Sequence, residues 1–191
     1  MARRVAISGG PGGGKSTVAE ALRRELGASV VVVPEVATHL LGGFFPGIEC
    51  ADDRRAVQRA IYHVQLNLEA IHRARAGTDG VLVFDRGIID GAAYWPDGSD
   101  AFFETVCGDA HAARGQYDAV VFLESAAQGG LAIDSENVAR TERQREAARL
   151  DALLYELWSP HPEFRFVGHT PAFETKVEAA LATLRELIAA G

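Results

Sequence analysis

Five short apolar runs recur along the chain, and segments with helical periodicity lie between them. The runs occupy residues 3–8, 29–35, 80–87, 117–125 and 163–168. Each is nearly continuous in apolar residues, which is typical of strands buried on both faces. Strands of this kind that alternate with helices predict an α/β fold, in which a parallel sheet is covered by helices on both sides.

The helical segments are predicted from apolar positions spaced three and four residues apart. One helix is expected over residues 16–26, a weaker one over 100–114, a long one over 138–158 and a closing one over 172–190. Another begins near Asp52 or Asp53, either of which can cap it. Two helices show a clear apolar stripe that we expect to face the core. These stripes are Val57, Ile61, Val64, Leu68 and Ile71, and Leu150, Leu153, Leu154, Leu157 and Trp158.

A glycine-rich segment joins the first predicted strand to the first predicted helix. Residues 7–20 read ISGGPGGGKSTVAE, and Gly9, Gly14, Lys15 and Ser16 fit the pattern G-x-x-x-x-G-K-[ST]. Such a loop lets backbone N–H groups converge on phosphate, and the following helix adds the positive end of its dipole. The nucleotide-binding residues predicted here are Gly9, Gly10, Pro11, Gly12, Gly13, Gly14, Lys15, Ser16 and Thr17.

The lysine of this loop is unusual for this chain. Of 19 basic residues only Lys15 and Lys176 are lysines, so arginine is the usual cation here. A lysine supplies a compact, mobile charge for the β- and γ-phosphates, whereas a planar guanidinium is too wide for the loop. We therefore predict that Lys15 holds the phosphates of a nucleotide, and that the Ser16 hydroxyl coordinates Mg²⁺.

Ligands of parallel sheets bind beyond the carboxyl ends of the strands, so the residues that follow each strand are candidates for chemistry. Asp85 is expected to help hold the metal, with a structural helix cap as the alternative. Arg86 suits a clamp on the acceptor or on phosphate, or else a local ion pair. Glu35 ends the second strand and could accept a proton from an acceptor hydroxyl, or simply begin the next helix. Glu124 is expected to be structural.

A cluster of arginines opens the long helix of residues 138–158. On a continuous helix Arg140 and Arg143 fall on or beside the leucine side, towards the ligand edge, while Arg145 and Arg149 point away. Arg140 and Arg143 are therefore predicted to reach the transferring phosphate, although a plain solvated charge run remains the alternative. Four aromatic residues in two loops could wall the acceptor pocket or belong to the surface or core: Phe44, Phe45, Tyr94 and Trp95.

Charge, apolar run length and residue spacing argue against several classes of function. The 191 residues carry a net charge of −7, which argues against a general nucleic-acid or anionic-membrane surface. No apolar run is long enough for a membrane span. Cys50 and Cys107 match no metal or disulfide pattern, and with no evident signal peptide they predict a cytoplasmic protein. The six histidines show no metal-binding spacing.

Four stretches together resemble a known family. SGGPGGGKST, VVPE, FDRG and RTERQREAARLD…LYELWSPHPEFRFVGHTPAFETKVEAAL are similar to the small P-loop ATPase and kinase domains of AAA-domain group 28. They also resemble nicotinamide-riboside kinase domains and the nucleotide-binding domain of TRPL translocation defect protein. The resemblance implies one nucleoside-kinase-like P-loop domain over residues 1–191, with strand order 2-3-1-4-5. It also implies an arginine-bearing lid at about residues 125–145, and an acid near the acceptor at Glu35 or Asp85.

Two functions are consistent with these features. The first is an ATP- and Mg²⁺-dependent kinase that phosphorylates a small hydroxyl-bearing acceptor such as a nucleoside or related metabolite. The second is a regulatory module or switch that binds ATP or GTP and has no acceptor. The sequence leaves open the acceptor, the choice between ATP and GTP, the base and the oligomeric state.

Overall fold

A computed structural model describes residues 2–43, 45–77, 80–128 and 138–189 of the chain, without the side chains of residues 138–142. The strands are β1 (Arg3–Ser8), β2 (Val30–Val33), β3 (Val81–Asp85), β4 (Ala119–Leu123) and β5 (Phe164–Val167). The helices are α1 (Lys15–Leu26), α2 (Val36–Leu41), α3 (Ala51–Ala76), α4 (Ser99–Phe102), α5 (Ala110–Arg114), α6 (Val138–Trp158) and α7 (Phe173–Ala189). Three further helical segments are the 3₁₀ helices η1 (Gly27–Ser29) and η2 (Asp90–Tyr94) and the π-helix η3 (Phe103–Cys107).

The five strands form one parallel sheet in the order β2-β3-β1-β4-β5. This is the predicted order, and each strand lies within its predicted apolar run. Ile7 of β1 is in register with Asp85 of β3 and with Val121 of β4. The carboxyl ends of the three central strands therefore meet at one edge of the sheet, where the glycine loop begins.

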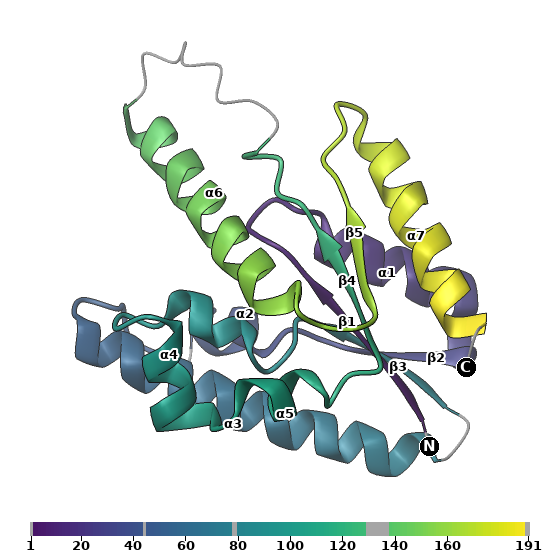
Figure 1. Cartoon of the computed structure of the whole chain (residues 1–191), viewed down its shortest axis with the longest axis horizontal. Helices are drawn as coiled ribbons and strands as arrows, with labels where there is room; N and C mark the ends of the chain where they lie inside the picture. Colours follow the sequence, from purple (N-terminus) through teal and green to yellow (C-terminus); the bar gives the residue numbers. More distant parts are fainter. Residues whose placement is uncertain (1, 44, 78–79, 129–137, 190–191) are drawn as a thin grey trace.

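Helices cover both faces of the sheet, as the alternation of elements predicts (Figure 1). On one face α1 and α7 pack over a core that includes Val5, Leu22 and Leu184. On the other face α3, η2, α4 and α6 pack over a core that includes Phe84, Phe102 and Trp158. The leucine stripe of α6 faces this second core as predicted, because Leu150, Leu154 and Leu157 are all buried.

The apolar stripe predicted for α3 is only partly confirmed: Val57 is buried and Leu68 packs against the core, but other members of the stripe face outward. Val64 and Ile71 are 44% and 47% exposed, whereas the buried side chains include three polar ones, Gln58, Gln65 and Glu69. The helix is therefore rotated so that much of its inward face is polar. Such a face is stable only where its polar groups find partners or line a cavity, and both situations occur here.

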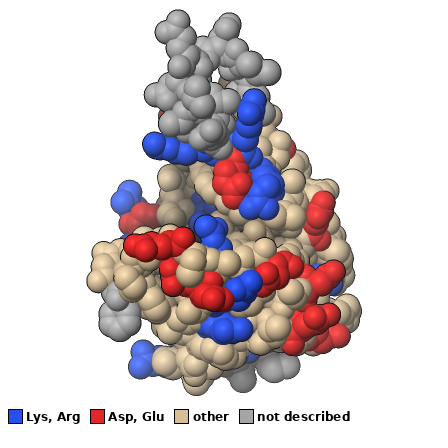
Figure 2. Space-filling view, turned by 90° about the vertical axis from the view of Figure 1, so that its left-hand side faces the viewer, with Lys and Arg blue, Asp and Glu red and all other residues tan. Residues whose placement is uncertain are grey.

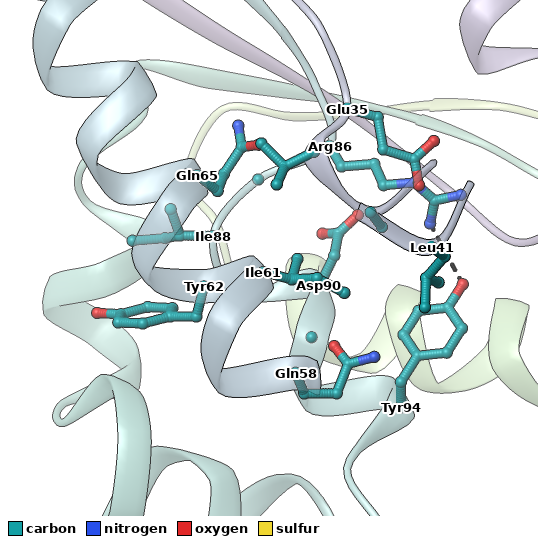
Figure 3. Close-up of a pocket in the computed structure, with 14 residues that line it drawn as sticks. Glu35, Leu41, Gln58, Ile61, Tyr62, Gln65, Arg86, Ile88, Asp90 and Tyr94 are labelled. Atoms are coloured by element: carbon teal, nitrogen blue, oxygen red, sulfur yellow. Dashed lines mark hydrogen bonds and ion pairs between the residues drawn. The ribbon is translucent and has the colours of Figure 1, made fainter. Parts of the chain in front are cut away.

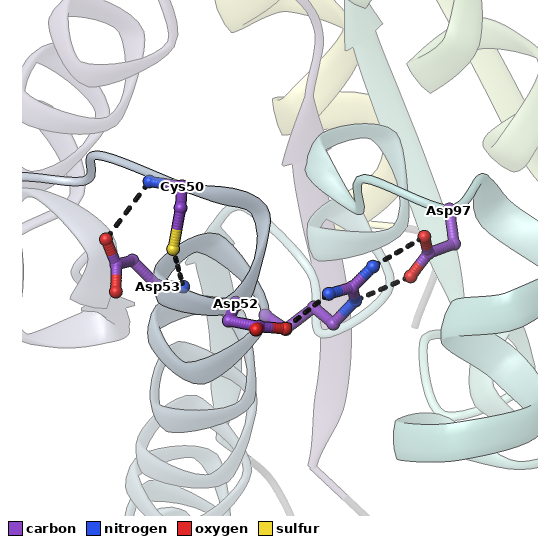
Figure 4. A network of polar contacts seen from close by, with 5 residues as sticks. Cys50, Asp52, Asp53 and Asp97 are labelled. Carbon is purple, nitrogen blue, oxygen red and sulfur yellow. Dashed lines mark hydrogen bonds and ion pairs between the residues drawn. The ribbon is translucent and has the colours of Figure 1, made fainter.

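The start of α3 also differs from the prediction in detail. Cys50, not Asp52 or Asp53, is the N-cap, and its Sγ accepts a hydrogen bond from the Asp53 amide at 3.4 Å (Figure 4). The Asp53 carboxylate accepts in return from the Cys50 amide at 3.1 Å. Arg55 then makes a bidentate bond to Asp97 at 2.6 and 2.7 Å, which ties α3 to the loop before α4.

Two further expectations concern helices. The segment 100–114 is not one helix but α4, η3 and α5 in succession, consistent with its weak periodicity. Within the described ranges, no helix combines the length and apolar composition that crossing a bilayer requires.

Cys50 and Cys107 are free cysteines that form no disulfide with each other. The cytoplasmic location and the single-domain organisation stay predictions.

Candidate functional site

The glycine loop lies between β1 and α1 and is shaped by close contacts with β4. Gly9 has a φ of 137°, and a Cβ there would lie 2.1 Å from the carbonyl oxygen of Leu123. Gly14, with a φ of 91°, is the left-handed N-cap of α1. Both positions need glycine, the first for space as well as conformation and the second for conformation. The loop conformation is therefore encoded in its own residues.

Lys15 folds back over this loop. Its Nζ donates to the carbonyl oxygens of Gly9 and Gly10 at 2.7 and 2.8 Å, and only 5% of the residue is exposed. Burial, and to a smaller extent nearby Arg86, lowers the pKa of Lys15 to about 8, although acidic neighbours oppose the change. The ammonium thus sits at the start of α1 with a weakened hold on its proton, which a polyphosphate would strengthen.

The second lysine of the chain also supports the loop, a role that the sequence reasoning missed. Lys176 of α7 is 3% exposed, and its Nζ donates to the carbonyl oxygen of Gly13 at 2.7 Å and to that of Glu124. From the other side of the sheet, Asp151 of α6 accepts from the Gly10 amide at 2.7 Å. The scarcity of lysine was the only available signal for Lys176, and nothing in the sequence marked Asp151.

Ser16 and Asp85, the two predicted metal ligands, lie together. The Ser16 hydroxyl donates to Asp85 Oδ2 at 3.1 Å, while Asp85 Oδ1 is buried and makes no hydrogen bond among the described residues. Burial raises the pKa of Asp85, and the bond from Ser16 opposes the rise. A hydroxyl beside a carboxylate with a spare oxygen fits Mg²⁺, which takes oxygen ligands together with those of a nucleotide. The described residues contain no cluster of three or more His, Cys, Asp or Glu side chains that could hold a metal alone.

A cavity of about 200 Å³, here called the phosphate cavity, opens over the loop. Its lining residues are Pro11, Gly12, Gly14, Lys15, Ser16, Thr17 and Arg86. Most of the predicted nucleotide-binding residues therefore surround one hollow, and Arg86 reaches it from the end of β3. Figure 2 shows basic side chains within a hollow between the α6 side of the molecule and the α2–α4 side, with acidic side chains on the rim.

Arg86 and Glu35 form an ion pair at the edge of this cavity. Arg86 Nε lies 2.6 Å from Glu35 Oε1 without meeting hydrogen-bond geometry, and Arg86 Nη1 donates to the Tyr94 hydroxyl at 3.2 Å. Arg86 has a φ of 78°, the left-handed conformation that favours glycine. A non-glycine residue held there carries backbone strain of about 1 to 3 kcal/mol, which is common at functional sites. Glu35 also accepts from the Thr38 hydroxyl at 3.1 Å.

A second cavity of about 200 Å³, the α3 pocket, adjoins the first and shares Arg86 with it. It is lined by residues of α2, by the inward face of α3 and by residues 86–94. In Figure 3 Glu35, Arg86 and Tyr94 lie on one side of the pocket and Gln65 on the other. Of the predicted aromatic walls, Tyr94 lines the pocket, whereas Trp95 packs in the core and Phe44 lies outside the described residues.

The polar face of α3 supplies the groups that the sequence reasoning missed. Gln58, Tyr62 and Gln65 line the pocket, and Glu69 lies buried behind Gln65. Their spacing of 4, 3 and 4 residues along the helix is itself a periodic signal. The apolar stripe of Val57, Ile61, Val64 and Leu68, whose members each lie one residue before these positions, concealed it.

Asp90 was also missed, although it lies only five residues after Asp85. It is 3% exposed and accepts from the Ser8 hydroxyl at 3.0 Å and from Trp158 Nε1 at 2.6 Å. Burial raises its pKa to about 6, with Arg86 and both hydrogen bonds opposing the rise. Asp90 therefore ties the end of β1 to η2 and α6 beneath the pocket.

The lid prediction falls largely outside the described part of the chain. Residues 129–137 are not described, nor is the side chain of Arg140. Arg143 is exposed on α6 and makes no hydrogen bond or ion pair with another described residue. Arg149 pairs with Glu146 on the solvent side, as expected for an arginine that points away.

The parallel sheet of order 2-3-1-4-5 and its glycine loop define a P-loop protein with a kinase-like fold. A similar fold occurs in deoxyadenosine kinase from M. mycoides with bound dATP, at a TM-score of 0.59 and 14% identity. The match covers 96% of this chain and 99% of that one. The AAA-domain model of group 28 matches residues 4–167, so the chain belongs to this family of AAA domains, as the motifs predicted. No curated protein matches in sequence, so the likeness to nicotinamide-riboside kinase domains and to TRPL translocation defect protein stays a prediction.

Proposed function

We propose that the protein is an ATP- and Mg²⁺-dependent kinase that phosphorylates a hydroxyl group of a nucleoside or related metabolite. One observation carries the proposal: the phosphate cavity and the α3 pocket adjoin and share Arg86. Glu35 pairs with Arg86 at that boundary. A module that only binds a nucleotide needs the first cavity but not the second.

Each residue at the boundary has a proposed role. Residues 9–17 bind the nucleotide phosphates, and Lys15 carries charge towards the transferring group. Ser16 and Asp85 would hold Mg²⁺, whose charge helps neutralise that of the phosphates. Glu35 accepts the proton of the acceptor hydroxyl as its oxygen attacks the γ-phosphorus of ATP and ADP leaves. Arg86 orients Glu35, and Arg140 and Arg143 are proposed to approach from the lid.

The direct test is ADP release with ATP, Mg²⁺ and a panel of nucleosides and related alcohols. We expect at least one acceptor to stimulate release. Glu35→Gln should lower that stimulated rate about 10²- to 10⁴-fold, the range for loss of a general base. Its nucleotide affinity, measured by calorimetry, should stay close to that of the unmodified protein.

The matched control is Glu186→Gln, the same chemical change at an exposed position of α7. It should leave both measurements unchanged. If no acceptor stimulates ADP release while ATP binds normally, the kinase proposal is wrong and the nucleotide-binding module becomes the better description. Substituting GTP for ATP in the same assay decides the donor.

A further inference from the structure

A chain of buried hydrogen bonds fixes one of the two glutamines in the α3 pocket. Gln65 Nε2 donates to Glu69 Oε1 at 3.0 Å, and the Tyr117 hydroxyl donates to the same carboxylate at 2.9 Å. Tyr117 in turn accepts from the Ile88 amide at 2.8 Å. Glu69 and Tyr117 are 2% and 3% exposed, so water cannot replace these partners.

These bonds decide which way the Gln65 amide points. The Tyr117 oxygen already accepts from a backbone N–H, so its own proton is available for Glu69. An ionised carboxylate only accepts hydrogen bonds, and therefore it must face the nitrogen of Gln65 and not the oxygen. Gln65 Oε1, which has no hydrogen-bond partner among the described residues, is left for the pocket together with the second N–H of Nε2.

Gln58 provides the contrast on the same helix. It lines the same pocket and is also buried, yet its side-chain amide makes no hydrogen bond to a described residue. Nothing there distinguishes its two amide orientations, so Gln58 can turn over to suit either a donor or an acceptor. Gln65 cannot turn over without setting its oxygen against the Glu69 carboxylate.

We propose that Glu69 and Tyr117 hold the side-chain amide of Gln65 in a single orientation. The pocket then selects acceptors whose ring edge carries an amino group beside an unprotonated ring nitrogen. The amino N–H donates to Gln65 Oε1, and the ring nitrogen accepts from Gln65 Nε2. An edge with an oxo group beside a ring N–H sets acceptor against acceptor and donor against donor. Glu69 thus acts as a positioning residue. The inference rests on the proposed kinase function, because it assumes that the acceptor occupies the α3 pocket.

The charge state of Glu69 sets the condition for the test. Burial raises the pKa of Glu69 to about 7, while the bonds from Gln65 and Tyr117 oppose the rise. The charged neighbours are Arg73 on α3, which lowers the pKa, and Asp90 on η2, which raises it. A protonated Glu69 could donate to Gln65 Oε1 and release the constraint. The assays therefore belong at about pH 8, where the carboxylate predominates.

The experiment compares two matched pairs of acceptors, adenosine with inosine and cytidine with uridine. For the full chain at about pH 8, kcat/KM with ATP and binding in the absence of ATP are measured for all four. We expect the amino member of a pair to be favoured about tenfold or more, the range for a bidentate contact. Glu69→Gln should reduce this ratio to within about threefold of unity, since a neutral amide partner accepts either orientation of Gln65.

The ratio is the readout because a general loss of stability would lower both members of a pair alike. Glu186→Gln should keep the ratio of the unmodified protein. If Glu69→Gln does not fold, Gln65→Leu replaces it: loss of the ratio supports the inference, and an unchanged ratio overturns it.

The two proposals fail in different ways. Phosphorylation of both members at equal rates, a preference for the oxo member, or an unchanged ratio in Glu69→Gln overturns the inference and leaves the kinase proposal standing. If none of the four is phosphorylated, the binding ratio alone decides the inference, and the wider acceptor panel decides the kinase proposal. If none of the four binds either, the inference is overturned, and the kinase proposal again depends on the panel.

Discussion

The phosphate cavity and the α3 pocket adjoin, yet they are built in opposite ways. The phosphate cavity is formed largely by consecutive residues, and buried hydrogen bonds to Lys15, Lys176 and Asp151 hold its loop from several sides. The α3 pocket is assembled from α2, α3 and residues 86–94, which are distant in sequence. The first region is held in place by the protein itself, whereas in the second the Gln58 amide has no hydrogen-bond partner among the described residues.

The difference shows that one part of the site is rigid and the other is free to vary. Phosphate is the same in every nucleotide, so a rigid loop can serve all of them. Acceptors distinguish one kinase from another, and under the proposed function the residues that would contact the acceptor come from elements that can vary independently. Four changes would break or sharpen this comparison.

The largest effect is expected from Gly9→Ala, which changes the glycine loop of the phosphate cavity. The added Cβ would lie 2.1 Å from a backbone oxygen of β4, and alanine is strained at a φ of 137°. We expect the free energy of unfolding, from urea denaturation, to fall by about 3 kcal/mol. Gly47→Ala is the control, because a Cβ there meets nothing within 4 Å. Equal stability of the two variants would show that the loop is not rigid.

Lys176→Met tests whether the loop needs support from α7. The change leaves two carbonyl oxygens without their buried donor, which weakens the support of the loop. Nucleotide affinity, measured by calorimetry, should fall about tenfold. Acceptor binding without nucleotide should not change, because Lys176 is not among the residues lining the α3 pocket. An equal loss of both affinities would mean that the two regions are not independent.

The pH dependence of nucleotide binding sharpens the role of Lys15. Its pKa of about 8 in the free protein means that a growing fraction is neutral above that pH. Because polyphosphate favours the charged form, affinity should decrease by about tenfold between about pH 7 and pH 9. Lys15→Met should bind more weakly and show no such decrease. A flat profile for the unmodified protein would place the binding charge elsewhere.

The smallest effect is expected from Tyr94→Phe in the α3 pocket. It removes the hydroxyl that accepts from Arg86 Nη1 but keeps the ring. One hydrogen bond to a charged group is lost, so KM for the acceptor should rise about fivefold with little change in nucleotide affinity. A change in nucleotide affinity as large as that in KM would show that Arg86 serves mainly the phosphate side.

The sequence predicted the phosphate cavity better than the α3 pocket, because the first is formed largely by consecutive residues and the second by residues distant in sequence. The glycine loop could be recognised because its geometry depends on adjacent residues, and the sheet order came from the family that its motifs resemble. Glu35, Asp85 and Arg86 could be proposed because strand ends meet at one edge of a parallel sheet. The ion pair between Glu35 and Arg86 could not, because it depends on the register of β2 against β3 and on the conformations of the two side chains.

The buried face of α3 shows where pattern reasoning fails. Apolar stripes normally mark the core, but on α3 the pocket and the partners of Glu69 require polar groups inside. The support of the loop by Lys176 and Asp151 was equally hidden. These residues lie 163 and 141 positions from the glycines that they contact.

The placement of the two lysines has a practical consequence for labelling. Both amines are engaged with carbonyl oxygens of the glycine loop, and at most 5% of either residue is exposed. An amine-directed dye or crosslinker therefore finds no accessible lysine on the folded chain. Any lysine that such a reagent does modify reports that the loop has opened, which turns a common labelling reaction into a probe of its movement.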